Sequence, residues 1–209
     1  PGSKGVPEGA VKNTLISAYN DLESVKKHFE EHTDIAAVII EPICGNMGVV
    51  IPQNNFLKEL KEYLETKGAL LIADEVMTGF RSKFGGAQEL LGVEADITCL
   101  GKVIGGGFPV GAYGARNEIM EEVAPLGGMY QAGTLSGNPI AMAGGISTLT
   151  EVKRQNPYDQ FNETASILEV ILLETAKKYN VDLVVNRFGS MMNPFFTKGK
   201  VTDFDEAQT

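Results

Sequence analysis

Short apolar runs recur along this chain, and each of them stops at a charged residue, a proline or a glycine. The clearest lie within residues 36–41, 69–73 and 96–100. A run of this length is typical of a strand that is buried on both faces, as in a parallel sheet. Amphipathic segments separate the runs. The pattern therefore predicts an α/β domain with a mostly parallel sheet between helices.

The remaining elements follow from periodicity and from capping residues. We expect helices at residues 21–29, 54–67, 117–123, 138–154 and 158–179, and further strands at 110–115, 181–188 and 191–197. Residues 1–20 are typical of a loop with a short strand, and residues 199–209 match no recognisable element. The pattern breaks near residue 156. We therefore predict a large domain at 1–155 and the start of a smaller α+β domain at 156–209.

Composition excludes several functional classes. The 209 residues carry a net charge of −9, which disfavours general nucleic-acid binding because phosphate backbones attract clustered Lys and Arg. The apolar runs are too short to span a bilayer, and no signal peptide is visible. The chain begins with Pro1 rather than Met, so we expect an internal or processed start.

The cysteines and histidines indicate neither a disulfide nor a metal centre. Cys44 and Cys99 lie in or beside apolar strands, which favours buried free thiols in a reducing compartment over a disulfide. His28 and His32 share one face of a charged helix without further ligands nearby, which favours a solvated face over a zinc site. We expect a cytoplasmic protein without a metal site.

Two neighbouring strands end in residues that suit one kind of chemistry. Asp74 follows the run at 69–73, and Lys102 follows the run at 96–100 and precedes three glycines at 105–107. A lysine can bind pyridoxal phosphate (PLP) as a Schiff base, a carboxylate can keep the pyridine nitrogen protonated, and glycines allow the backbone to approach a cofactor. This pairing predicts a PLP site.

Both residues have other interpretations. A simple loop cap also explains Asp74, and the strand before it also matches a Walker B strand, but the G-x-x-x-x-G-K-[ST] loop that an ATPase needs upstream is missing. Most lysines are solvated surface charges. Lys102 has the apolar neighbours Leu100, Val103 and Ile104, so we expect it to be buried, where desolvation favours the neutral amine.

Thr134 lies in a flexible, hydroxyl-bearing loop that runs into the helix beginning near Asn138 and Pro139. Such a loop can bind phosphate through its N–H groups and hydroxyls. Asn138 as a plain helix cap, with Pro139 in the first turn, explains the same residues. The two functions use different atoms and are compatible.

Together these motifs resemble the class III aminotransferases, which have the PLP-dependent transferase (fold type I) architecture. The resemblance runs through the chain and is carried by residues 41–48 (EPICGNMG), 74–81 (DEVMTGFR), 100–111 (LGKVIGGGFPVG) and 130–139 (YQAGTLSGNP). Typical class III transaminases have glutamine where this chain has Met77, and G-x-G-G where it has residues 45–48. Both departures fit the aminomutase branch of the family, whose reaction converts (S)-glutamate-1-semialdehyde to 5-aminolevulinate in tetrapyrrole biosynthesis.

The resemblance implies a role for each candidate residue. Lys102 is similar to the Schiff-base lysine and proton shuttle, and Asp74 to the partner of the pyridine nitrogen. Val76 is similar to a residue packed on the ring, and Asn46 to one near the ring oxygen. Thr134 is similar to a threonine that reaches the cofactor phosphate of the other subunit, so a homodimer is implied.

The resemblance also implies that the family's phosphate-binding loop, ring-stacking pair and lid precede residue 1, and that most of the small domain follows residue 209. We therefore expect a central fragment with little activity alone. Two alternatives stay open, a class III ω-amino-acid transaminase and a non-catalytic fragment. Turnover without an added amino acceptor would distinguish the aminomutase from the transaminase.

Overall fold

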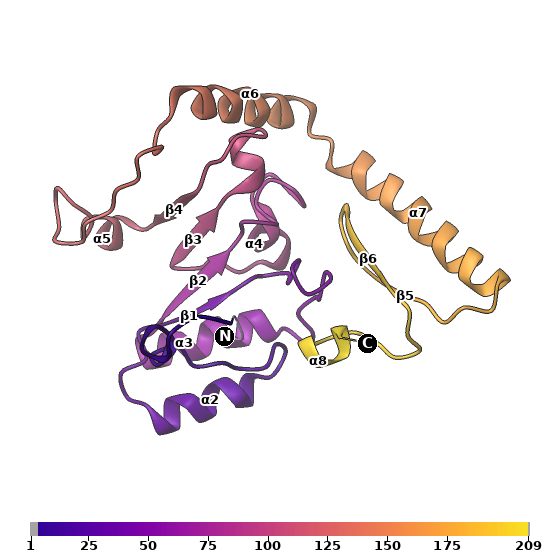
Figure 1. Ribbon diagram of the computed structural model, residues 1–209, viewed down its shortest axis with the longest axis horizontal. Coiled ribbons are helices and arrows are strands. Elements are labelled where there is room, and N and C mark those ends of the chain that lie inside the picture. The colour runs from indigo at the N-terminus through magenta and orange to yellow at the C-terminus, as the bar shows by residue number, and fades with distance from the viewer. Residues whose placement is uncertain (1–3, 209) are drawn as a thin grey trace.

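The computed structural model describes residues 4–208, and helices surround a central sheet (Figure 1). The helices are α1 Glu8–Val11, α2 Leu22–Glu31, α3 Phe56–Lys67, α4 Gly86–Leu91, the 3-10 helix η1 Lys102–Gly105, α5 Asn117–Met120, α6 Pro139–Gln155, α7 Tyr158–Lys178 and α8 Phe204–Ala207. The strands are β1 Ala37–Ile40, β2 Leu70–Asp74, β3 Ile97–Leu100, β4 Ala112–Ala115, β5 Val184–Phe188 and β6 Met191–Phe195.

The main sheet has four strands in the order β1-β2-β3-β4. β1, β2 and β3 are parallel, whereas β4 is antiparallel to β3. In the register of these strands Ile40 lies opposite Ala73, and Asp74 lies opposite Cys99. The predicted α/β class with a mostly parallel sheet is confirmed. Because parallel strands end at one edge of a sheet, residues that follow β1, β2 and β3 meet there.

Capping residues bound three of the helices: Asp21 begins α2, Gly68 ends α3 and Asn138 begins α6. The carboxylate of Asp21 accepts a hydrogen bond from the N–H of Ser24 at 3.1 Å, which satisfies a free donor in the first turn of α2. Gly68 ends α3 at φ +69°, a conformation that glycine adopts without a Cβ penalty. At the start of α6, the side chain of Asn138 accepts from the N–H groups of Ile140 and Ala141.

One hydrophobic core joins α2 and α3 to the sheet. Residues from both helices and from β2 pack together and exclude water, which is the main favourable term in folding. The buried members are Val25, Phe56, Leu57, Leu60, Leu64, Ala69, Leu71 and Val93. This core holds β2 in place from one side and so fixes the position at which β2 ends.

The prediction that residues 36–41 are buried on both faces was wrong. Ile39 in β1 is 64% exposed, although Val38 and Ile40 are packed against the core. β1 is the first strand in the sheet order and pairs only with β2 within the described residues 4–208. An apolar run therefore predicts a strand, but it does not show whether neighbouring elements cover both faces of that strand.

Three local predictions also differ from the structure. Residues 4–20 contain the short helix α1 and no strand, and residues 1–3 lie outside the described part. The segment 199–208 contains α8, whose cap Asp203 accepts from the N–H of Glu206 at 2.8 Å. The helix α4 was not predicted. Each of these three helices has at most six residues, which is too short for a helical period to stand out.

The β5–β6 hairpin packs against α7 and also touches the first part of the chain. The two strands are antiparallel, with Val184 opposite Phe195. Met191 packs with Ile43, and Phe195 packs with Cys44. The proposed division between 1–155 and 156–209 stays a prediction, and its outermost residues 1–3 and 209 lie outside the described range.

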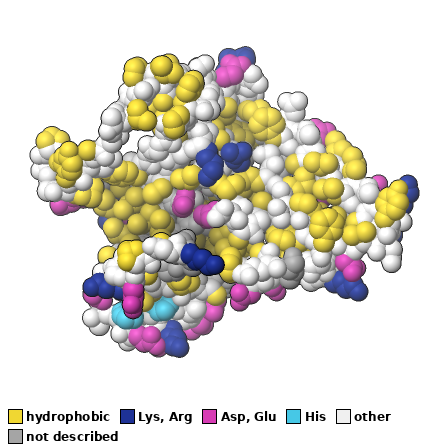
Figure 2. All heavy atoms as spheres, in the orientation of Figure 1, with side chains coloured by type: hydrophobic (Ala, Val, Ile, Leu, Met, Phe, Trp, Pro, Cys, Tyr) yellow, Lys and Arg dark blue, Asp and Glu magenta, His cyan; other side chains and the backbone are white. Residues whose placement is uncertain are grey.

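Large apolar side chains are exposed along α6 and α7, and Figure 2 shows them gathered over both helices. Among them are Ile140, Met142, Ile146, Phe161, Ile167, Leu168, Val170, Ile171 and Leu173. Contiguous exposed apolar surface of this kind marks an interaction face. Within residues 4–208, no helix combines the length and the apolar character that crossing a membrane requires.

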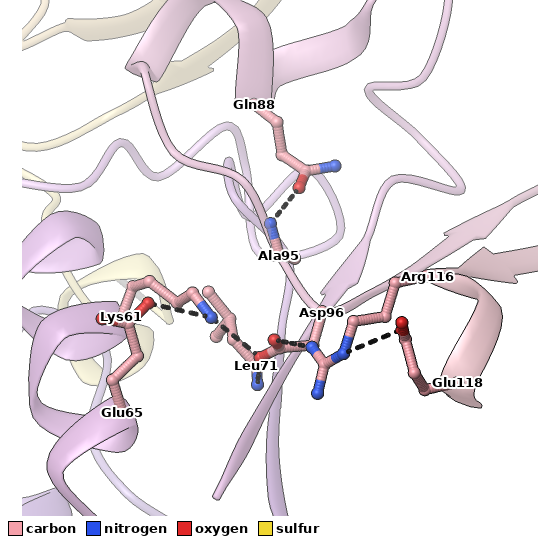
Figure 3. A network of polar contacts seen from close by, with 8 residues as sticks. All are labelled: Lys61, Glu65, Leu71, Gln88, Ala95, Asp96, Arg116 and Glu118. Carbon is pink, nitrogen blue, oxygen red and sulfur yellow. Dashed lines mark hydrogen bonds and ion pairs between the residues drawn. The ribbon is translucent and has the colours of Figure 1, made fainter. Parts of the chain in front are cut away.

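A polar cluster around Asp96 fixes the opposite, amino-terminal edge of the sheet (Figure 3). The carboxylate of Asp96 accepts from the N–H of Leu71 at 2.8 Å, from Lys61 at 3.0 Å and from Arg116 at 2.6 Å. Burial by itself would raise the pKa of Asp96, but these donors outweigh it and the net pKa is lowered. Asp96 thus ties α3, β2 and the end of β4 to the start of β3.

We predict that Asp96→Asn lowers the free energy of unfolding by about 1–3 kcal/mol near neutral pH, because the charge that Lys61 and Arg116 face is lost. The folded pKa of Asp96 is depressed, so its contribution is present above the ordinary carboxyl pKa and is lost as the pH falls through the folded value. The difference between the variant and the wild type should therefore shrink in acid. Urea denaturation at several pH values measures it.

The matched control is Asp182→Asn. Asp182 pairs with Lys198 at 3.6 Å, but both side chains are exposed, so this change should cost less than about 0.5 kcal/mol. Equal losses for the two variants, or a loss at Asp96 that does not depend on pH, would contradict the role of Asp96.

Candidate functional site

Asp74 is the last residue of β2 and lies at the carboxyl edge of the parallel strands. Its Oδ1 accepts a hydrogen bond from the N–H of Val76 at 3.0 Å. The next residue, Glu75, donates its N–H to the carbonyl of Cys99 at 2.9 Å, which extends the pairing of β2 with β3 past Asp74. The backbone at Asp74 is therefore held to β3 at this edge, and ligands bind at such edges in open α/β sheets.

Lys102 begins η1, two residues after β3 ends. Its backbone has φ +47°, which is unusual for a residue with a side chain and which recurs where a site imposes a conformation. The expectation that Lys102 is buried was wrong, because its side chain is exposed. The apolar neighbours Val103 and Ile104 follow the lysine into η1, while the lysine itself points out beyond the strand end.

The side chain of Lys102 lines a hollow of about 550 Å³. Arg81, Val103, Gly107, Phe108 and Pro109 also line the hollow. The Nε of Arg81 donates to the carbonyl of Met77 at 2.8 Å, which fixes the guanidinium beside the lysine. Two cations and an aromatic ring face one open space, which suits an anionic, partly apolar ligand.

Val76 packs on the backbone that leads to Lys102. A Cβ at Gly101 would lie 3.1 Å from Cγ1 of Val76, so glycine permits this close approach. A Cβ at Gly45 would likewise lie 2.6 Å from Sδ of Met77. The loop after β1 and the loop after β2 are therefore pressed against each other at the same edge of the sheet.

Asn46 lies in the loop after β1, and the carboxylate of Glu41 holds the backbone of this loop. Oε2 of Glu41 accepts from the N–H of Gly45 at 3.0 Å and from that of Asn46 at 3.4 Å. Burial raises the pKa of Glu41, and the two N–H groups lower it. The charge of Asp74 raises the pKa further and that of Lys102 lowers it, and the net effect is a raised pKa. The charges of Asp74 and Lys102 thus both act on the carboxyl group of Glu41.

Both cysteines are free in the structure, as predicted. Burial raises the pKa of Cys99, and the charge of Asp74, which lies opposite it in the sheet, raises the pKa further. Burial also raises the pKa of Cys44, and the charge of Glu41 adds to the effect. Both thiols stay protonated near neutral pH, which makes them poor nucleophiles.

Thr134 is the predicted site residue that the structure does not place with the others. It is exposed, in the extended segment that joins α5 to α6 along the outside of the molecule (Figure 1). Leu126, Met129, Tyr130 and Leu135 of this segment are exposed as well. The remaining four candidates, Asn46, Asp74, Val76 and Lys102, come from three consecutive strand ends.

A buried carboxylate beside Asp74 organises the loop that follows. Glu75 is 1% exposed, and it accepts from the hydroxyl of Thr78 and from the N–H groups of Ala87 and Gln88 at 3.0 and 2.8 Å. Residues 76–85, which carry Val76 and Arg81, are thereby closed into a loop. A buried carboxylate with three donors is fully paired.

Sequence reasoning missed Glu41, Glu75 and Arg81 as members of this site. The rule that identified Asp74, a carboxylate directly after a buried strand, applies equally to Glu41 and could have found it. Nothing in the sequence separates Glu75 from Asp74, because only the fold shows which of the two carboxylates turns inward. Arg81 comes seven residues after Asp74, and the loop closure alone brings it back.

The residues fit a PLP-type cofactor. A lysine amine would serve as a covalent anchor, a carboxylate one strand away as a partner for a ring nitrogen, and a valine beside the lysine backbone as a packing surface. The glycine at 101 allows backbone and cofactor to approach closely. Thr134, the residue expected to bind the phosphate, lies apart from this set on the outer segment.

The sequence matches known proteins along its whole length. The model of the family described as aminotransferase class III matches residues 7–207. A glutamate-1-semialdehyde 2,1-aminomutase of Persephonella marina is 53% identical over 210 residues, covering 100% of this chain and 49% of the relative. A glutamate-1-semialdehyde 2,1-aminomutase 2 of Brevibacillus brevis is 55% identical, with the same coverage. The chain spans about half the length of these relatives.

Solved structures share the fold. An omega-transaminase from Sphaerobacter thermophilus superposes with a TM-score of 0.91 at 31% identity, covering 99% of this chain and 48% of the other. A glutamate-1-semialdehyde-aminomutase from Pseudomonas aeruginosa, in complex with PMP, superposes with a TM-score of 0.84 at 28% identity, covering 98% and 48%. The predicted fold class is thereby confirmed a second time.

We predict that Gly86→Ala destabilises the loop that Glu75 closes. Gly86 has φ +74°, and an added Cβ would lie 2.6 Å from Oε2 of Glu75. Gly92→Ala is the matched control, because Gly92 also has positive φ, at +63°, but nothing within 4 Å of the added atom. Gly86→Ala should cost about 1–3 kcal/mol more than the control in urea denaturation. Equal costs would show that the carboxylate yields freely.

Proposed function

The chain belongs to the class III aminotransferase family, and we propose that it is part of a PLP-dependent aminomutase that converts (S)-glutamate-1-semialdehyde to 5-aminolevulinate. The observation that carries this proposal is the placement of Asp74 and Lys102 at neighbouring strand ends, with Val76 beside the lysine backbone. The two glutamate-1-semialdehyde aminomutases at 53% and 55% identity support the choice of reaction within the family.

In this proposal the chain's residues bind, orient and move protons. The cofactor, when bound, supplies an amine in its pyridoxamine phosphate (PMP) form, an aldehyde that takes up amines in its PLP form, and a ring that accepts electrons. Asp74 holds a proton on the ring nitrogen, because its negative charge favours the positively charged form. The hydrogen bond from Val76 N–H keeps that carboxylate in one orientation. The ring then remains an electron acceptor throughout the reaction.

Lys102 has two tasks. Its amine would hold the cofactor and, when free, would move a proton between the substrate carbon and the cofactor carbon, as general base and then general acid. Its position on the first residue of η1, beyond the end of β3, lets the exposed side chain reach into the hollow. Transfer within one molecule needs no separate amino donor or acceptor.

The remaining candidates bind the cofactor. Val76 packs against one ring face, Asn46 lies near the ring oxygen, and Thr134 reaches the phosphate held by a second copy of the chain. The exposed apolar residues around Thr134 and along α6 support a homodimer. We place the protein in the cytoplasm, where its free thiols stay reduced.

An ω-amino-acid transaminase is the second candidate, favoured by the superposition on the Sphaerobacter thermophilus omega-transaminase. It would use Asp74 and Lys102 in the same way but release a keto product and require an amino acceptor. The two candidates make opposite predictions about turnover with a single substrate.

We predict that Lys102→Ala abolishes covalent attachment of PLP. The test protein is the Persephonella chimera, defined here as the Persephonella marina relative whose aligned central region is replaced by this chain. After borohydride reduction, mass spectrometry should find PLP linked to residue 102 of the parent and no linked PLP in the variant. Lys58→Ala, an exposed lysine of α3, is the control and should label fully. A reduced adduct in the Lys102 variant would refute the anchor.

We predict that the Persephonella chimera forms 5-aminolevulinate from glutamate-1-semialdehyde without any amino acceptor, and that Asp74→Asn lowers kcat at least about 100-fold while the protein stays folded. An amide cannot favour the protonated ring nitrogen through charge, so the ring accepts electrons less well. Product formation and circular dichroism measure the two effects. Turnover that depends on an added acceptor would favour the transaminase, and near wild-type turnover in the variant would refute the role of Asp74.

A further inference from the structure

The loop after β1 is closed at its base and compressed at its centre. Cys44 and Val50 exchange backbone hydrogen bonds in both directions, at 2.9 and 3.1 Å. The N–H of Gly48 donates to the carbonyl of Gly45 at 3.1 Å, which folds the segment between them into a turn. Because Gly45 is pressed against Met77, the turn has little freedom to shift toward β2.

The carboxylate of Glu41 fixes how this turn begins. It accepts from the N–H groups of Gly45 and Asn46, at 3.0 and 3.4 Å. The backbone of Glu41 is itself held in place, because the hydroxyl of Tyr19 donates to the carbonyl of Glu41 at 3.4 Å and to that of Pro42 at 2.9 Å. Glu41 thus links the restrained end of β1 to the backbone of Asn46.

Glu41 also faces the candidate site electrostatically. Because Ile40 lies opposite Ala73 in the parallel register, Glu41 and Asp74 leave neighbouring strands at the same level. Adjacent parallel strands lie about 4.8 Å apart. The charges of Asp74 and Lys102 both act on the carboxyl group of Glu41. The charge of Glu41 is therefore a second route by which a change at this residue can act on the site, and Glu41→Gln, which removes only the charge, separates it from the hydrogen bonds.

We propose that Glu41 is a positioning residue of the cofactor site, which sets the place of the Asn46 side chain by holding the backbone of its turn. This inference rests on the proposed function, since it assumes that Asn46 contacts bound PLP. Glu41 itself need not touch the cofactor. The alternative is that Glu41 caps its turn for stability alone, and the two differ in what they predict for the bound cofactor.

The test measures PLP in the Persephonella chimera by its dissociation constant and by the pH midpoint of its visible absorbance. Glu41→Gln keeps an oxygen that can accept both N–H groups, whereas Glu41→Ala removes it. We expect Glu41→Ala to weaken PLP binding about tenfold and to shift the midpoint in the direction that Asn46→Ala shifts it. Glu41→Gln should stay within about threefold of the parent, which separates the hydrogen bonds from the charge.

A double-mutant cycle then asks whether Glu41 acts through Asn46. In the Asn46→Ala background, adding Glu41→Ala should cause no further loss of PLP affinity and no further shift of the midpoint. Glu62→Ala, an exposed carboxylate on α3, should change neither quantity. Thermal unfolding of every variant without cofactor shows how much of each effect is loss of stability.

Each outcome decides between the interpretations. Additive effects of Glu41→Ala and Asn46→Ala, or a lower melting temperature with unchanged PLP affinity and midpoint, would overturn the positioning role. Equal losses for Glu41→Gln and Glu41→Ala would show that charge rather than hydrogen bonding is responsible, and would also overturn it. If the parent chimera binds no PLP at all, the proposed function itself fails, which is a distinct result.

Discussion

The parallel pairing of β2 with β3 is the constraint on which the candidate site depends. Asp96 anchors one end of the pair by accepting from Leu71, and the N–H of Glu75 closes the other end on Cys99. Between these two contacts the register has no freedom to slip, and a slip by one residue would turn Asp74 to the other face of the sheet. Asp74 and Lys102 are thereby fixed relative to each other before any ligand binds.

Much of the fold could be predicted from the sequence because local signals and tertiary packing agree. Asp21, Gly68 and Asn138 end or begin helices where their side chains or backbone conformations require it. Burial was predicted less well. Ile39 is apolar yet exposed, and Lys102 has apolar neighbours yet reaches solvent. Exposure depends on which elements lie alongside a residue, and that information is spread over the whole chain.

The candidate site, like the fold, has residues that the sequence predicts and residues that only the tertiary structure reveals. Asp74 and Lys102 were identified from strand ends and glycines, because the chemistry of a cofactor site limits which residue types can stand there. Glu41 and Glu75 were not identified, since their partners are backbone N–H groups of residues 45–46 and 87–88. A backbone donor leaves no trace in residue type. Thr134 was predicted from its motif, and the contact that we propose for it needs a second copy of the chain.

The three carboxylates at the carboxyl edge of the sheet differ in burial and in hydrogen-bond partners, and their roles differ accordingly. Glu75 is buried and both of its oxygens accept hydrogen bonds, which close the loop that carries Val76 and Arg81. Glu41 is half-buried and accepts from a turn that carries Asn46. Asp74 accepts from the N–H of Val76 through Oδ1, which leaves lone pairs of its carboxylate at the sheet edge for a ligand. Glu75 and Glu41 thus hold the surrounding loops, and Asp74 is the carboxylate that we propose contacts the cofactor.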